Sequence, residues 1–139
     1  MQVYVNGKFV EEAEAVVSVF DRGFRYGDGL FETLRAYSGH LLFLKEHLER
    51  LRSSAISIAM DDGAVDDALK NIKDNIEALL AVNKLTDRDA YVRITMTRGG
   101  ASRTTHLPPK ALSPTIVIET EPIDSTAIES LQAEGVSAI

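Results

Sequence analysis

DRGFRYGDGLFETLRAYSG, residues 21–39, is the segment from which the architecture of this chain is read most directly. Residues 30–37 favour a strand, and Ser38-Gly39 favours a turn. The two-residue period of a strand places alternate side chains on opposite faces: Phe31, Thr33, Arg35 and Tyr37 on one, and Leu30, Glu32, Leu34 and Ala36 on the other. Each face therefore carries a charge, and a charge that becomes buried needs a partner.

The glycine-rich part of this segment admits two interpretations. Gly23, Gly27 and Gly29 allow the backbone to approach a ligand closely, with Tyr26 projecting between them as part of a pocket wall. Alternatively, the glycines form a turn decorated with surface arginines. The residues taken alone favour the turn.

Further strands are expected on both sides of this segment. Asn6-Gly7 is a strong signal for a two-residue hairpin turn, and residues 16–20 form a short apolar run. Alternation predicts strands over residues 2–5, 9–10, 40–44, 90–98 and 115–119.

Helical periodicity appears in the middle of the chain. Apolar residues recur at helical spacing from Leu44 to Ile58, and Asp61-Asp62-Gly63 interrupts the pattern. A second helix is expected to carry the apolar stripe from Val65 to Leu80. Strands, two helices and strands in this order predict an α+β domain with an antiparallel sheet.

The composition limits the classes of function. The chain has 139 residues, 45% of them hydrophobic and 26% charged, which is typical of a globular domain. A net charge of −6 without a basic run argues against a nucleic-acid partner or a membrane partner. The absence of cysteine excludes disulfides and thiolate metal sites and suits a cytoplasmic location. The three histidines show no metal-ligand spacing, so no metal site is expected.

Several arginines are candidates for binding an anion. Arg50 is expected on the polar side of the first helix, where its guanidinium could bind a phosphate through two hydrogen bonds. The alternative, which the residues alone favour, is an i,i+4 ion pair with Glu46 on a solvated face. Tyr91 and Arg93 share the polar face of a later strand, which either lines a carboxylate pocket or faces solvent.

Four segments together resemble a known family. VYVNGKFV, VSVFDRGFRYGDGLFETLRAY, LKEHLERLRSSA and YVRITMTRG are similar, in order and spacing, to the small N-terminal domain of fold-type IV pyridoxal-phosphate enzymes. This family includes branched-chain aminotransferases, D-amino-acid aminotransferases and 4-amino-4-deoxychorismate lyases. The resemblance covers residues 3 to about 119 and favours the pocket over the turn.

The resemblance implies roles for individual residues. Arg50 would bind the phosphate of pyridoxal 5'-phosphate, and Arg35 matches a polar residue beneath the substrate pocket. The other substrate-side residues it implies are Tyr26 and Phe31 in the pocket lining, Tyr91 and Arg93 near the substrate carboxylate, and Arg103 and His106 as a carboxylate trap. Two threonines separate Arg103 from His106, where the trap of D-amino-acid aminotransferases has one residue.

The resemblance also implies what this chain lacks. The Schiff-base lysine of the family would lie beyond Ile139, since none of the lysines present matches its position: Lys8, Lys45, Lys70, Lys73, Lys84 and Lys110. No catalytic residue is therefore assigned, and the chain alone is expected to be inactive. We expect a small N-terminal domain over residues 1–119, a linker over 120–130, and the beginning of a truncated large domain over 131–139.

The intact protein is accordingly expected to be a cytoplasmic, homodimeric aminotransferase that uses pyridoxal 5'-phosphate. Its substrates would be an amino acid and a 2-oxo acid. One alternative is a 4-amino-4-deoxychorismate lyase, and another is a non-catalytic interaction or dimerisation module.

Overall fold

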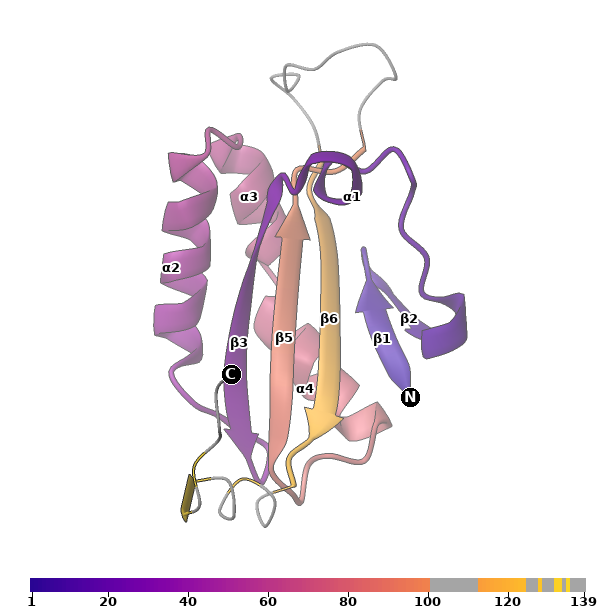
Figure 1. The fold of residues 1–139 in the computed structure, drawn as a ribbon, viewed down its shortest axis with the longest axis vertical. Coiled ribbons are helices and arrows are strands. Elements are labelled where there is room, and N and C mark those ends of the chain that lie inside the picture. Colours follow the sequence, from indigo (N-terminus) through magenta and orange to yellow (C-terminus); the bar gives the residue numbers. More distant parts are fainter. Residues whose placement is uncertain (101–112, 125–127, 129–131, 134, 136–139) are drawn as a thin grey trace.

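The computed structural model describes residues 1–100 and 113–124, together with Ile128, Gln132, Ala133 and Gly135. Within them one six-stranded sheet has the order β2-β1-β6-β5-β3-β4, and neighbouring strands run antiparallel (Figure 1). The strands are β1 (Gln2–Val5), β2 (Lys8–Glu11), β3 (Gly29–Tyr37), β4 (His40–Leu41), β5 (Ala90–Thr97) and β6 (Thr115–Pro122). The antiparallel α+β architecture predicted from the sequence is confirmed.

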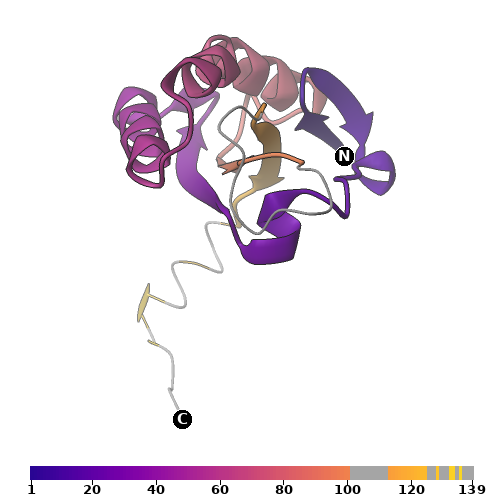
Figure 2. The ribbon, with the colours of Figure 1, turned by 90° about the horizontal axis from the view of Figure 1, so that it is seen from above.

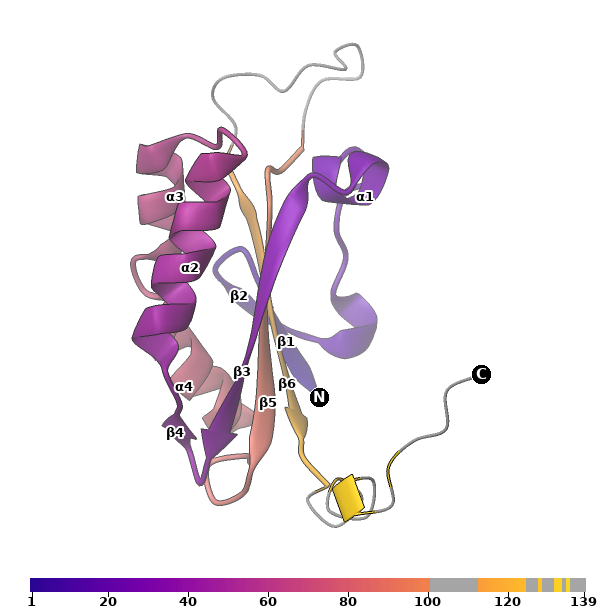
Figure 3. The same cartoon turned by 60° about the vertical axis from the view of Figure 1, so that its left-hand side comes forward.

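The helices divide between the two faces of the sheet. Figure 2 and Figure 3 show α2 (Leu44–Ser57), α3 (Asp62–Leu69) and α4 (Ile72–Val82) on one face. The short α1 (Arg22–Tyr26) and a 3-10 turn (Glu12–Glu14) lie on the other side. Among residues 1–100 and 113–124, no other helix or strand covers that second face.

The hydrophobic core lies between the sheet and the three longer helices. Burial alternates along β5 from Ala90 to Met96, as its sequence predicts. Fully burying a side chain such as Ile94 contributes about 1.5–3 kcal/mol to stability. The principal fully buried side chains are Leu51, Val65, Ile72, Ile76, Leu79, Leu80, Val92, Ile94, Met96 and Ile118.

Turn chemistry confirms the first hairpin. Asn6 and Gly7 have φ angles of 47° and 91°, which match the positive values that a tight hairpin turn requires. Each residue of β1 pairs with one of β2 across this turn.

Two local predictions are wrong, and one helix was not expected from the sequence. The second predicted helix is two helices, because Asn71 leaves the helical region (φ −117°, ψ 22°) and separates α3 from α4. The predicted arm over residues 40–44 is only β4, since Leu44 already begins α2. The glycine-rich part contains a helix, α1, capped by the Asp21 side chain and ended by Gly27 at φ 65°.

β6 is longer than expected and continues into the stretch assigned to a linker. Thr120 is 3% exposed and pairs with Val92, so the strand is still part of the packed sheet beyond Glu119. Pro122 forms the last pair of β6, with Ala90. At the end of a strand its missing N–H removes little of the hydrogen bonding between strands. Most of residues 131–139 lie outside the described part of the chain.

Among the described helices, none combines the length and apolarity needed to cross a bilayer. The same residues contain no cluster of three or more side chains placed to hold a metal ion.

Candidate functional site

The sheet face opposite the three longer helices carries polar side chains in two rows across β3, β5 and β6. The register aligns Thr33 with Arg93 and Glu119 in one row, and Arg35 with Tyr91 and Glu121 in the next. We call these six residues the open face. A hollow of about 360 Å³ lies among all of them except Arg35.

Arg35 is held by two tyrosines. Its Nη1 donates to the Tyr37 hydroxyl at 3.1 Å, and its Nη2 lies 3.5 Å from the Tyr91 hydroxyl. The hydrogen bond to Tyr37 raises the pKa of Arg35, and charge interactions with both tyrosines act in the same direction. Arg35 therefore stays cationic beside the hollow.

Arg93 lies at the centre of the open face. Its guanidinium carbon is 3.9 Å from the centroid of the Phe31 ring, which is 58% exposed. A guanidinium stacked on a ring keeps its N–H donors for other partners. No ion pair within 4 Å joins Arg93 to Glu119, its neighbour across the strands, in the part of the chain that the structure describes.

A second hollow connects the open face with helix α2. β4 pairs with Ala36 and Tyr37, and before Ala36 no other strand of the described residues pairs with the outer edge of β3. A hollow of about 270 Å³ at this edge is lined by Thr33, Leu34, Arg35, Leu42, Phe43, His47 and Tyr91. Groups on α2 and on the open face therefore border the same space.

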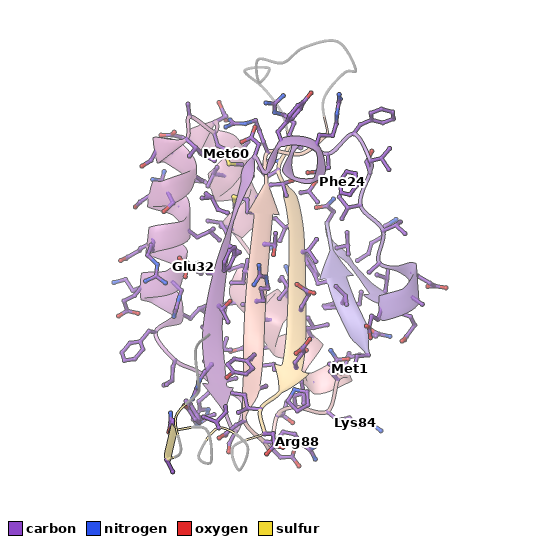
Figure 4. All side chains as sticks on the ribbon, in the orientation of Figure 1. Met1, Phe24, Glu32, Met60, Lys84 and Arg88 are labelled. Atoms are coloured by element: carbon purple, nitrogen blue, oxygen red, sulfur yellow. The ribbon has the colours of Figure 1, made fainter. Side chains whose placement is uncertain are left out.

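An apolar hollow of about 360 Å³ lies between α1 and the sheet. Phe24, Phe31 and Val117 are among its lining residues, and Phe24 is 76% exposed (Figure 4). Tyr26 does not line this hollow or either of the two just described. It is stacked between Arg22 and Arg25, whose guanidinium carbons lie 4.7 and 5.0 Å from its ring centroid.

Asp28, whose side chain is 14% exposed, joins the glycine-rich segment to the rest of the fold. Asp28 Oδ2 accepts hydrogen bonds at 2.8 Å from Nε of both Arg22 and Arg98. Arg98 also donates to the carbonyl oxygens of Ile58 and Ala59 at the end of α2. Burial raises the pKa of Asp28, but the hydrogen bonds from Arg98 and Arg22 outweigh it and hold the pKa below the ordinary value.

Asp21 anchors the start of α1. It is 1% exposed and accepts hydrogen bonds from the Gly23 N–H and from the hydroxyls of Thr97 and Thr115, at 2.7 to 2.9 Å. The two aspartates therefore hold α1 above the ends of β5 and β6.

Arg50 pairs with Glu32 and not with Glu46, the partner that helical spacing suggested. Its Nε and Nη2 both donate to the carboxylate of Glu32 on β3, and Glu46 is not involved. His47 Nδ1 lies 2.8 Å from the same carboxylate. Hydrogen bonding by Arg50 lowers the pKa of Glu32 despite its burial, and Glu32 in turn raises the pKa of Arg50. His47 and Arg50 thus both point towards β3 from helix α2.

The structure brings together some of the predicted site residues. Phe31, Arg35, Tyr91 and Arg93 share one face of the sheet, as their positions in the strands predict. Tyr26 is set apart on α1, and Arg50 lies on α2 at the far side of the β3 edge. Arg103 and His106 lie outside the described residues.

Sequence reasoning missed Glu119, Glu121, Thr33 and His47 as neighbours of the site. The alternation in TIVIETEP already places both glutamates on the face opposite the buried isoleucines. Their position beside Arg93 follows from strand order and register, which alternation does not give. A buried charge on Glu32 requires partners, and Arg50 and His47 provide them.

Comparison with known proteins gives consistent matches. A family model described as amino-transferase class IV matches residues 29–138. A putative branched-chain-amino-acid aminotransferase of Methanocaldococcus jannaschii is 48% identical over 99 residues, which are 71% of this chain and 33% of that protein. A D-alanine aminotransferase of Staphylococcus epidermidis is 36% identical over 138 residues, which are 99% of this chain and 46% of that protein.

Solved structures show the same likeness. Branched-chain amino acid aminotransferase of Escherichia coli matches with a TM-score of 0.72 and 25% identity, over 88% of this chain and 40% of that one. 4-Amino-4-deoxychorismate lyase of Pseudomonas aeruginosa matches with a TM-score of 0.61 and 33% identity, over 86% and 39%. The chain spans between a third and just under half of the curated relatives described above.

Proposed function

Because this chain belongs to the class IV aminotransferase family, we propose that it forms the substrate-side part of a pyridoxal-phosphate-dependent amino-acid aminotransferase. The observation that carries the proposal is the open face, where Arg35 and Arg93 stand beside hollows large enough for a small molecule. An amino acid and a 2-oxo acid both carry a carboxylate, for which arginine is the best-suited partner.

The residues present fit a phosphorylated cofactor. Arg50 is charged, its side chain is 64% exposed, and Glu32 occupies only the edge formed by Nε and Nη2. The N–H groups of Nη1 therefore remain for a phosphate oxygen. Pyridoxal 5'-phosphate, when bound, supplies the electron sink that amino-group transfer requires.

Each side chain of this region has a task in the proposed site. Arg50 binds the cofactor phosphate, and Arg93 binds the substrate carboxylate with Arg35 as a second cation beneath it. Tyr91 holds Arg35 in place through its hydroxyl. Phe31 and Phe24 present apolar surface that excludes water from the reacting region. The lysine that moves the proton is expected in the part of the enzyme that this chain does not supply.

The proposal extends to the assembly and its location. The intact enzyme is proposed to be a cytoplasmic homodimer, with its site completed by the large domain. Residues 1–119 would be its small domain, extended by the remainder of β6, and the following residues would lead into the large domain.

Replacing Arg50 with alanine is expected to weaken binding of pyridoxal 5'-phosphate about 100-fold, because one charge-assisted contact to the phosphate is lost. The measurement is a titration of the intact apoprotein followed by cofactor absorbance. Arg52→Ala is the control, since Arg52 lies on the same helix and pairs with Asp66 instead. Equal affinity in wild type and Arg50→Ala would remove Arg50 from the cofactor site.

The reaction itself is tested by supplying the intact protein with an amino acid and 2-oxoglutarate. Amino transfer is expected, and Arg93→Ala should raise the KM for the amino acid roughly 10- to 100-fold with a smaller effect on kcat. Arg88→Ala is the control, because the Arg88 side chain is exposed and its Nε lies 3.7 Å from Oδ1 of the exposed Asp87. Formation of pyruvate from aminodeoxychorismate without any amino transfer would favour the lyase alternative, to which the Pseudomonas aeruginosa structure points.

A further inference from the structure

Glu32 is a buried carboxylate in a row of apolar side chains on β3. Its neighbours on the same face of β3, Leu34 and Ala36, belong to the core, and Glu32 itself is 6% exposed. Figure 4 shows Glu32 on the side of β3 that faces α2. A buried ion pair replaced by well-packed apolar residues is often neutral or stabilising. Stability therefore does not account for a carboxylate here.

The contacts of Glu32 restrict mainly the side chain of Arg50. Oε1 accepts from Arg50 Nε at 2.7 Å, and Oε2 accepts from Arg50 Nη2. A carboxylate bound at two points fixes both the position and the plane of a guanidinium. His47 Nδ1, 2.8 Å from Oε2, holds the carboxylate from the helix side.

The free part of Arg50 is therefore oriented as well. An arginine has five N–H donors in a planar fork, and Glu32 uses one on Nε and one on Nη2. Nη2 also lies 3.1 Å from His47 Nδ1. The two N–H groups of Nη1 therefore remain for another ligand. Without Glu32, a side chain that is 64% exposed would sample many rotamers and would have to be ordered when an anion binds.

We propose that Glu32 is a positioning residue, which holds the Arg50 guanidinium with its free end directed at the cofactor phosphate. The inference rests on the proposed function, because it takes Arg50 to be the phosphate ligand. Glu32 acts through Arg50 and does not touch the cofactor, since like charges would repel. Its contribution is the orientation of Arg50 before the phosphate arrives.

Glu32→Asp separates orientation from charge. The aspartate keeps the negative charge but withdraws the carboxylate by about 1.5 Å, one carbon–carbon bond, so it cannot hold Arg50 at two points. We expect the affinity of the intact apoprotein for pyridoxal 5'-phosphate to fall about tenfold. The affinity for pyridoxal, which lacks the phosphate, should stay within twofold of wild type. If Glu32→Asp does not fold, Glu32→Gln keeps the side-chain length and is tested with the same two ligands.

Two comparisons decide whether Glu32 acts through Arg50. Glu46→Asp shortens an exposed carboxylate on the same helix and should leave both affinities unchanged. In an Arg50→Ala background, Glu32→Asp should cause no further loss, because the side chain that it orients is absent. Unchanged or tighter binding of pyridoxal 5'-phosphate to Glu32→Asp, an equal loss for pyridoxal, or a loss that persists without Arg50 would each overturn the inference.

The outcomes also distinguish this inference from the proposed function. If Arg50→Ala weakens binding and Glu32→Asp does not, the cofactor site stands and only the role of Glu32 is wrong. If Arg50→Ala itself has no effect, both the phosphate assignment and the role of Glu32 fail.

Discussion

Replacing Asp28 with alanine is expected to lower the free energy of unfolding by about 3–5 kcal/mol. Asp28 is the shared acceptor of Arg22 and Arg98, which are 5% and 6% exposed. Removing the carboxylate takes their common counter-charge away from two buried guanidinium groups. The measurement is urea denaturation of the intact protein with and without the substitution.

Asp66→Ala is the matched control for Asp28→Ala. Asp66 also pairs with an arginine at close range, but both side chains of the Arg52–Asp66 pair are about half exposed. Exposed pairs contribute about 0–1 kcal/mol, so the control should change stability little. If the two variants lose the same stability, burial does not determine how much the hydrogen bonds of Asp28 with Arg22 and Arg98 contribute.

Stability is also expected to depend on pH through the carboxyl group of Asp28. The hydrogen bonds from Arg98 and Arg22 hold its folded-state pKa below the ordinary value, in spite of burial. A carboxyl with a depressed folded-state pKa contributes stability above its unfolded-state pKa, about 3.9 for aspartate, and loses it as pH falls through the folded-state pKa. Wild type should therefore lose stability more steeply below about pH 4 than Asp28→Ala does.

The second large effect is expected at Gly99, where alanine should lower the free energy of unfolding by about 3 kcal/mol. Gly99 has φ +87°, a conformation that side chains adopt only with strain. A Cβ there would also collide with the backbone oxygen of Ser113, at the start of the segment leading into β6. Backbone atoms cannot turn away as a flexible side chain can, so the strain and the collision add.

Gly7→Ala isolates the two contributions at Gly99. Gly7 has a similar φ of +91°, but a Cβ there would have nothing within 4 Å. Its substitution should therefore show the backbone strain alone, about 1–2 kcal/mol. Thermal unfolding of both variants measures the difference, and equal losses would mean that the contact with Ser113 has no energetic weight.

Gly99 and Asp28 matter to the site because they place its walls. The Gly99 carbonyl accepts from the Arg22 N–H at 3.0 Å, and Asp28 binds the Arg22 side chain. Both the backbone and the side chain of Arg22 are therefore bound, and this fixes the position of α1. Phe24, on the same helix, lines the apolar hollow. In the proposed aminotransferase, loosening this attachment of α1 should therefore lower the affinity for substrate before the protein unfolds.

Much of the fold could be predicted because its signals are local. A two-residue period marks β3 and β5, and the stripe from Leu44 to Ile58 marks α2. Asn6-Gly7 specifies its own hairpin through the φ angles that the turn needs. The helix in the glycine-rich segment was missed because its cap depends on Asp21, whose other partners are Thr97 and Thr115.

The site was predicted less completely, since its pairings join distant parts of the chain. Periodicity and turn chemistry act over a few residues, so the sequence placed Phe31, Arg35, Tyr91 and Arg93 on strand faces and Arg50 on a helix. Local spacing offered Arg50 a partner four residues away, whereas packing of α2 on β3 supplied Glu32, 18 residues away. Sheet order brought Arg98 to Asp28 across 70 residues. Such pairs depend on how the elements pack, which no short window of sequence contains.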